Sequence, residues 1–395
     1  MIMRHVAIPI REPEPPPRVA RRVPVPAADP INVVIGFVRS VSGWVFGAGT
    51  LWLALAVLSA VPLGQFLVLG YLLEACGRVA RSGRLKDGFV GVRTATRFGG
   101  AAVGCVILWL PLYGLSVMAD SARIIDPMGR GTRLWENWLT LLATLYALHV
   151  IAALLRGGRL RDFARPLNVF WLGTRCWRGG LLQEARDGVW SAVGTLRLPY
   201  YFWLGARGYA GGLLWLLIPL TLLGLGHRVP AVGVLGGFML GLVVVYLPFL
   251  QTRFARDNRF RGFRMLGAVR ATYRRAPLAF AVALSFHLLA AMPLYLMKIE
   301  LIPRDLAFLE GLVFLGFIFP ARLLDGWAYA RAARRDSPRH WVYRWAGRLA
   351  VIPVVVAYVL VVFSSQHLGW SGISSLYEQH AFLLPVPFVS WDWSS

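Results

Sequence analysis

"SVSGWVFGAGTLWLALAVLSAVPLGQFLVLGYLL", residues 40–73, is a stretch of 34 residues without a charged side chain. An α-helix needs about 20 apolar residues to cross a lipid bilayer, so this stretch is too long for one span and short for two. Near its middle, Pro62 removes a backbone hydrogen-bond donor and Gly64 permits a turn. Residues 44–76 are therefore predicted to form a re-entrant helical hairpin that dips into the membrane and returns. A pair of short true spans is the alternative.

The rest of the chain has the composition of a membrane protein. Of its 395 residues, 57% are hydrophobic and only 15% are charged, whereas about 25% of residues are charged in a soluble domain. Seven further apolar runs are predicted to cross the bilayer as helices, near residues 99–119, 135–155, 209–226, 231–250, 277–297, 306–321 and 349–366. The sequence thus predicts an all-α polytopic helical membrane bundle over residues 44–366.

The positions of the basic residues predict how this bundle is oriented. Thirty-six of the 42 lysines and arginines lie in five segments at the ends of apolar runs, namely residues 1–39, 78–97, 156–207, 253–275 and 322–348. Basic residues concentrate on the cytoplasmic side of a membrane protein. The pattern predicts an inner (plasma) membrane protein with a cytoplasmic N-terminus and an outer C-terminus. The net charge of +23 would also suit nucleic acid, but this placement argues against a nucleic-acid partner.

The two ends of the chain differ in composition from the bundle. The first 43 residues contain eight of the 24 prolines together with several arginines, so they are predicted to form a disordered, Pro/Arg-rich cytoplasmic tail. Residues 367–395 contain no lysine or arginine and carry tryptophans at 391 and 393. This outer tail is predicted to lie on the surface at the membrane interface, and a docking site for an outer partner is the alternative.

A short motif recurs along the chain. "SGRLKDGF" (82–89) is matched by "GGRLRDF" (157–163), and "KDGFVGVRTATR" (86–97) by "RDGVWSAVGTLR" (186–197) and "RGFRMLGAVRATYR" (261–274). The pattern indicates a unit of interfacial helix followed by a span, used three times. Two pairs of arginines in it, Arg93 with Arg97 and Arg270 with Arg274, place like charges on one helix face. We predict that they contact anionic lipid headgroups; solvation of both guanidinium groups is the alternative.

The segment "LSAVPLGQFLVLGYLLEACGRVARSGRLKDGF" (58–89) resembles an uncharacterised family of prokaryotic multi-spanning membrane proteins, a domain of unknown function (4013-like). The shared features are Pro62 and Gly64 at the break, Gly70 and Tyr71 in the second arm, and the basic stretch that leads to Asp87. They cover about the first third of the chain. The resemblance implies an integral membrane protein and supplies no activity, cofactor or catalytic residue.

The sequence contains no motif of a known catalytic, metal or cofactor site, and we predict neither enzyme activity nor a cofactor. Two ionisable residues, His287 and Glu310, lie inside predicted spans, where burial of charge is costly. They form a candidate intramembrane polar site. The predicted role is a non-catalytic membrane scaffold or accessory subunit that binds lipids or a protein partner in a membrane complex.

Two other functions stay open at this point. A transporter for an unidentified solute would use His287 and Glu310 along a wet pathway. A membrane-embedded, lipid-modifying enzyme would gather cytoplasmic-side carboxylates, for which the sequence offers Asp87, Asp162, Asp187 and Asp325. Each of these aspartates lies near basic residues, so ion pairing or helix capping explains them equally well.

The predicted orientation can be tested with single cysteines. In a variant that lacks the three native cysteines, Ser82→Cys and Ser374→Cys should react with a membrane-impermeant thiol reagent from opposite sides of the membrane. Labelling of both positions from the same side would show that the hairpin of residues 44–76 does not make an even number of crossings.

Overall fold

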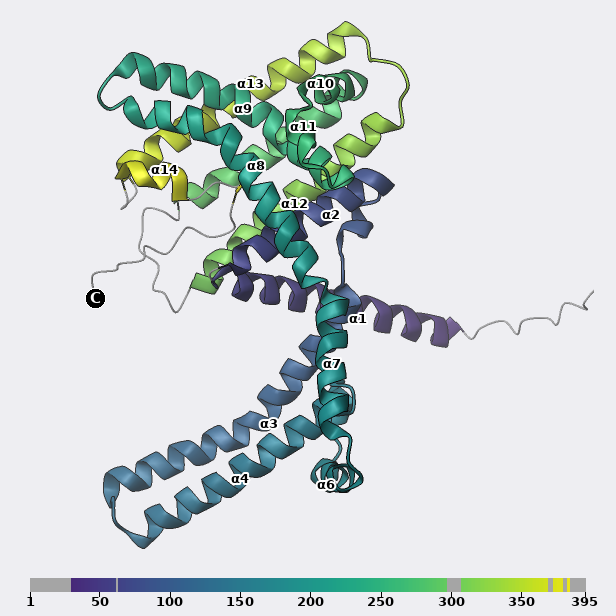
Figure 1. Cartoon of the computed structure of the whole chain (residues 1–395), viewed down its shortest axis with the longest axis vertical. Helices are drawn as coiled ribbons and strands as arrows, with labels where there is room; N and C mark the ends of the chain where they lie inside the picture. The colour runs from purple at the N-terminus through teal and green to yellow at the C-terminus, as the bar shows by residue number, and fades with distance from the viewer. Residues whose placement is uncertain (1–29, 62, 297–306, 369–371, 379–381, 384–395) are drawn as a thin grey trace, which may run out of the picture. The chain divides into compact units, whose positions relative to one another are not determined.

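The computed structural model describes residues 30–61, 63–296, 307–368, 372–378 and 382–383 (Figure 1). Within these residues the chain is helical and contains no strand, so the all-α prediction is confirmed. The elements are α1 (Pro30–Ser59), α2 (Gly64–Ser82), η1 (Leu85–Gly88), α3 (Val92–Ile125), α4 (Arg130–Leu155), α5 (Leu160–Phe163), α6 (Asn168–Arg178), α7 (Leu181–Leu196), α8 (Leu198–Leu225), α9 (Pro230–Asp257), η2 (Phe260–Arg264), α10 (Leu266–Arg275), α11 (Pro277–Leu296), α12 (Ala307–Ala333), α13 (Trp341–Leu368), η4 (Gly372–Ser374) and α14 (Ser375–Glu378).

The chain divides into two units, residues 1–42 and residues 43–395. The described part of the first unit is the beginning of α1. The second unit contains the remainder of α1 and all later helices, and it holds the candidate site discussed below.

Seven helices in the described residues are long and apolar enough to cross a membrane. Six of them, α3, α4, α8, α9, α11 and α13, coincide with spans predicted from the sequence. The seventh lies in α1 and covers the first arm of the predicted hairpin, whose second arm is α2. Pro62 lies outside the described residues, whereas Gly64 is the first residue of α2.

The predicted span 306–321 is the beginning of a longer helix. α12 continues to Ala333 and therefore includes Arg322 and Asp325 within its length. It is not one of the seven candidate spans. The apolar run predicted its start correctly, but its end lies 12 positions further along the chain because residues 326–330 are again uncharged.

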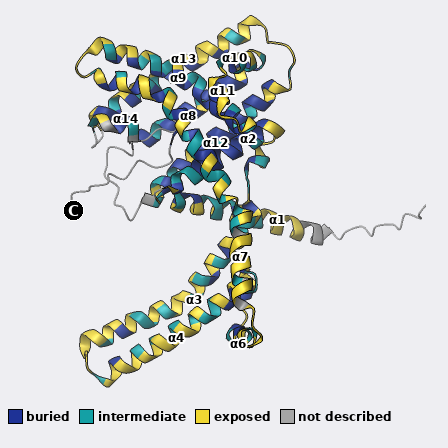
Figure 2. Ribbon diagram, viewed as in Figure 1, coloured by how far each residue is buried: buried dark blue, intermediate teal, exposed yellow. Residues whose placement is uncertain are grey.

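α2 lies at the centre of the second unit and is buried along most of its length (Figure 2). It packs against α8, α9 and α12. The contact with α8 is so close that a Cβ at Gly70 would overlap the Tyr201 carbonyl, and a Cβ at Gly205 would overlap the Phe66 carbonyl. Small residues permit such close backbone approach in membrane helices.

The hairpin of α3 and α4 is covered much less by protein. The two helices pack against each other, but Ile107, Leu110, Trp138 and Leu141 are all exposed, as are most of their neighbours (Figure 2). Apolar surface of this extent is stable in a bilayer and costly in water. The exposed apolar surface of this hairpin is therefore of the kind found on membrane-spanning helices.

The repeated motif forms short helical turns that connect longer helices. The first copy, residues 82–89, contains η1, and the second copy, residues 157–163, contains α5. The related segment after α9 contains most of η2. The interfacial helices expected at 186–197 and 261–274 correspond to α7 and α10. These helices end at Leu196 and Arg275, and one residue separates each of them from the next helix. The copy at 86–97 differs, because its helical part is continuous with the span as the beginning of α3.

The close contact between α2 and α8 should be sensitive to a single methyl group. Gly70→Ala is expected to lower the stability of the folded protein by about 1–3 kcal/mol, because the backbones must separate. Thermal unfolding in detergent would measure this loss. Gly114→Ala is the control, since a Cβ there meets nothing within 4 Å and alanine favours a helix. Equal melting temperatures for the two variants would contradict this account of the contact.

Candidate functional site

A group of polar side chains lies in the interior of the helical bundle. Its members are Cys76 on α2, Gln251 and Thr252 on α9, His287 on α11, and Arg322 and Asp325 on α12, and all of them have 0% exposure. Charged side chains are almost never fully buried unless they are paired. This group, called the core polar cluster below, is therefore the strongest candidate for a site.

The Arg322 guanidinium is the positive charge of the core polar cluster. Its Nη1 atom donates a hydrogen bond to Gln251 Oε1 at 2.6 Å, and its Nη2 atom lies 3.4 Å from the carbonyl oxygen of Phe382. Asp325 follows three positions later on α12, on the same helix face, and interacts electrostatically with Arg322. An arginine does not lose its proton in a protein, so these groups offset a permanent charge.

Asp325 joins α12 to α11. Its Oδ2 atom lies 2.6 Å from His287 Nδ1, and both side chains are fully buried. A second link runs from α2 to α9, where Cys76 Sγ lies 3.2 Å from Thr252 Oγ1. The core polar cluster thus connects four helices through hydrogen bonds between side chains.

The C-terminal residues complete the core polar cluster. The Phe382 ring packs on the His287 ring, with 4.9 Å between centroids, and the Phe382 carbonyl also accepts a hydrogen bond from Gln251 Nε2 at 2.7 Å. Leu376, Phe382 and Leu383 are all buried. The expectation that the outer tail lies on the surface is therefore wrong for these residues, because their apolar side chains fill the bundle instead.

Three atoms of the core polar cluster lack a hydrogen-bond partner among the described residues. They are Arg322 Nε, Asp325 Oδ1 and His287 Nε2. A buried polar atom without a partner costs about 1–3 kcal/mol, and more when the group is charged. The cluster therefore retains hydrogen-bonding capacity that the protein does not use.

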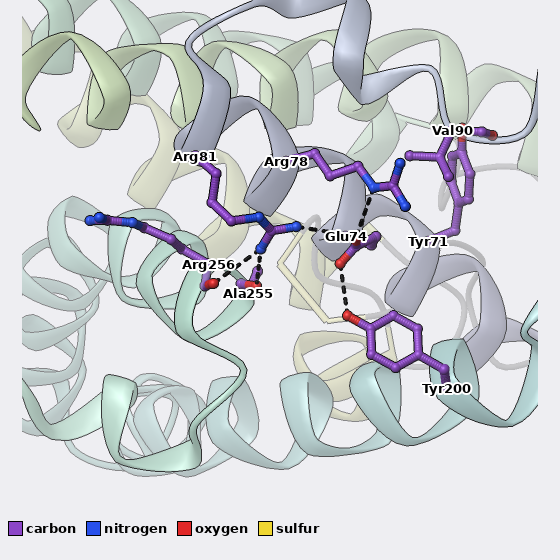
Figure 3. Close-up of polar contacts among 8 residues, drawn as sticks. All are labelled: Tyr71, Glu74, Arg78, Arg81, Val90, Tyr200, Ala255 and Arg256. Atoms are coloured by element: carbon purple, nitrogen blue, oxygen red, sulfur yellow. Dashed lines mark hydrogen bonds and ion pairs between the residues drawn. The ribbon is translucent and has the colours of Figure 1, made fainter. Parts of the chain in front are cut away.

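A second buried carboxylate, Glu74 on α2, has its hydrogen bonds satisfied (Figure 3). Oε1 accepts from Arg78 Nε at 2.8 Å and from Arg81 Nη2 at 3.2 Å, and Oε2 accepts from the Tyr200 hydroxyl at 2.8 Å. Arg81 also donates to the carbonyls of residues 255 and 256 at the end of α9. This arrangement fixes the end of α2 against α8 and α9 and is a structural junction.

The four arginines predicted to contact lipid, Arg93, Arg97, Arg270 and Arg274, are all exposed. Two of them are already engaged, because Arg97 Nε donates to the Gly157 carbonyl at 2.9 Å and Arg270 Nε to the Tyr246 hydroxyl at 3.2 Å. Within the described residues, the guanidinium groups of Arg93 and Arg274 have no hydrogen-bond or ion-pair partner.

The structure separates the two residues of the predicted intramembrane polar site. His287 is fully buried against Asp325, whereas Glu310 is half-buried near the start of α12 and has no hydrogen-bond partner in the part of the chain that the structure describes. Lys298, a predicted neighbour of Glu310, lies outside the described residues.

Two of the four aspartates that were predicted to lie on the cytoplasmic side have separate local roles, whereas Asp325 belongs to the core polar cluster. Asp162 caps the turn of α5 by accepting from the Arg159 backbone N–H and lies 3.4 Å from Arg165, and Asp187 pairs with Arg186. Over the described ranges, no group of three or more His, Cys, Asp or Glu side chains has the geometry of a metal site.

No family model matches this chain, and no curated protein or solved structure matches it either. The resemblance of residues 58–89 to a family of membrane proteins therefore stays a prediction.

The sequence prediction missed most of the core polar cluster. Arg322 and Asp325 follow an apolar run and were therefore placed at the cytoplasmic end of a span. One signal could have revealed the longer helix, because the residues between Asp325 and Arg331 are uncharged and largely apolar. The participation of Gln251 and Phe382 has no comparable signal, since it depends on tertiary packing.

The contributions of Arg322 and Asp325 to the free energy of unfolding should depend on each other. Arg322→Met or Asp325→Leu alone is expected to cost about 3–5 kcal/mol, because either leaves an uncompensated buried charge. The double variant should cost less than the sum of the two by at least about 1 kcal/mol. Reversible unfolding in mixed micelles would measure the three free energies.

The exposed pair of Arg123 and Glu136, with Nη2 and Oε1 2.6 Å apart, provides the control cycle. Solvent screens that pair, so Arg123→Met and Glu136→Leu should be close to additive. If the losses of unfolding free energy caused by Arg322→Met and Asp325→Leu add up in the double variant, the proposed mutual dependence is contradicted.

Proposed function

We propose that this protein is a non-catalytic scaffold or accessory subunit of the inner (plasma) membrane, which binds membrane lipids and a protein partner. The observation that carries the proposal is the packing of His287. A transport pathway would place this ionisable residue beside water, whereas it is fully buried between the Asp325 carboxylate and the Phe382 ring. A histidine held in this way fixes the position of α11 against α12.

The proposed orientation places the N-terminus in the cytoplasm and the C-terminus outside. It rests on the distribution of basic residues, and the amphipathic helix α6 supports it. α6 belongs to a segment rich in arginine and exposes Phe170 and Trp177, which are 74% and 94% accessible. Aromatic residues beside arginine suit the interface between lipid acyl chains and headgroups.

The lipid-binding part of the proposal concerns the exposed arginines on the proposed cytoplasmic side. Arg93 and Arg274 are the best candidates for contact with lipid phosphate, because their guanidinium groups are exposed and are not engaged by other described residues. Arginine binds phosphate through two parallel hydrogen bonds. Arg97 and Arg270 contribute positive charge nearby while they hold Gly157 and Tyr246.

Replacement of the two free arginines should weaken the binding of anionic lipid. In the variant Arg93→Gln/Arg274→Gln, we expect at least a twofold decrease in co-purified anionic lipid, measured by native mass spectrometry. The control Arg130→Gln/Arg228→Gln removes the same charge from exposed positions on the proposed outer side and should retain its lipid. Equal retention in both variants would contradict specific lipid binding.

The same preparation distinguishes a scaffold from a transporter. Proteoliposomes that contain the wild-type protein are expected to show no proton flux above empty liposomes. Flux in the wild type that is lost in Glu310→Gln, at an unchanged melting temperature, would overturn the scaffold proposal in favour of transport.

A further inference from the structure

The C-terminal residues enter the bundle beside α8. Ile373 and Leu376 lie against Gly224 near the end of this helix, and the Tyr377 hydroxyl lies 2.7 Å from the Thr221 hydroxyl. Leu383 lies against Gly212, which is twelve residues earlier on the same helix. At 1.5 Å per residue, this corresponds to a descent of about 18 Å into the bundle.

At this depth the core polar cluster presents two donors to a single oxygen atom. Gln251 Nε2 and Arg322 Nη2 both donate to the Phe382 carbonyl, at 2.7 and 3.4 Å. The hydrogen bond from Arg322 to Gln251 Oε1 fixes the amide so that its N–H group points to the same place. An arginine and an amide that converge on one oxygen are well suited to bind a carboxylate.

Phe382 is an incomplete partner for this arrangement. It offers a neutral carbonyl to a guanidinium, and the contact with Arg322 is long. It also leaves Arg322 Nε, Asp325 Oδ1 and His287 Nε2 without partners in the part of the chain that the structure describes. A ligand with a carboxylate and a positively charged donor would satisfy more of these atoms than Phe382 does.

We propose that the core polar cluster is a binding site for an aromatic α-amino acid, which Phe382 occupies in the structure described here. The ligand carboxylate takes the place of the Phe382 carbonyl and binds Arg322 and Gln251. The ligand ammonium group donates to the free oxygen of Asp325, and its ring takes the position of the Phe382 ring on His287. This inference goes beyond the scaffold function, since it concerns a small ligand and not lipid or a protein partner.

The charges of the site support this class of ligand. Arg322 and Asp325 together carry no net charge, so a zwitterion enters without adding one to the buried site. A simple anion would leave the Asp325 carboxylate uncompensated, and an amine without a carboxylate would leave Arg322 uncompensated. The ring is required because the face of His287 is now covered by an aromatic ring.

Displacement of Phe382 provides a direct test with the full-length chain. Phe382→Gly removes the ring that packs on His287 and frees the backbone of this segment, so residue 382 should leave the site, whereas Phe382→Leu should remain in place as the matched control. Equilibrium binding of radiolabelled phenylalanine to purified protein is expected to be at least tenfold tighter for Phe382→Gly than for Phe382→Leu or the wild type. Phenylalaninamide, which lacks the carboxylate, should not compete.

The role of the two charges is tested in the same background. Addition of Arg322→Gln and Asp325→Asn removes both charges and keeps hydrogen-bonding groups, and it should abolish binding. Each variant is accompanied by a melting curve, and binding is compared only among variants that unfold cooperatively.

A second measurement covers the case in which Phe382→Gly does not fold. Wild-type protein in millimolar phenylalanine should have a higher melting temperature than in millimolar phenylalaninamide, because a ligand that binds only the folded state stabilises it. No binding by a folded Phe382→Gly variant, or equal effects of phenylalanine and phenylalaninamide, would overturn the proposal. Phe382 would then be a packing contact only.

Discussion

A permanent positive charge in the interior, on Arg322, is the constraint that organises the bundle. Transfer of such a group from water to a protein interior costs several kcal/mol even after relaxation. The surrounding residues reduce this cost with a carboxylate three positions away on the same helix, the side-chain oxygen of Gln251 and the backbone carbonyl of Phe382. These groups come from α12, α9 and the C-terminal segment, so the compensation of one charge holds distant parts of the chain together.

Close packing of α2 brings the helices near enough for this compensation. A Cβ at Gly77 of α2 would meet the Ala255 carbonyl of α9, and a Cβ at Gly326 of α12 would meet the Cys76 carbonyl of α2. The two contacts lie beside Thr252 and Asp325 respectively. The glycines at these helix crossings and the polar side chains near them therefore form one structural unit. Close contact between the helix backbones sets the distance between the helices that the short side-chain hydrogen bonds require.

The sequence predicted those features that depend on contact with lipid. Apolar runs of sufficient length correctly located the helices of six spans, because the bilayer imposes that length on any helix that crosses it. The break near Gly64 was also visible, since proline and glycine act locally. The extension of α12 beyond Arg322 was harder to predict, because a charged residue after an apolar run is equally compatible with a helix end at the interface, and only the uncharged residues 326–330 indicate the longer helix.

Residue contacts between helices were beyond prediction for a different reason. The partner of His287 is Asp325, 38 positions away on another helix, and no local pattern specifies which face of α11 meets which face of α12. The burial of Phe382 is a similar case. Its segment is apolar enough for a surface-lying interfacial tail, and only the shape of the surrounding helices selects the interior.

Comparison of two buried carboxylates, Glu74 and Asp325, indicates which one belongs to a site. Glu74 accepts hydrogen bonds on both of its oxygens, from two arginines and a tyrosine, so neither oxygen needs a ligand. Asp325 uses one oxygen for its histidine, and its other oxygen has no partner among the described residues. The two groups are similarly buried, and burial alone would rank them equally. The unused hydrogen-bonding capacity, and not the depth of burial, distinguishes the structural junction at Glu74 from a cluster that can bind a further group.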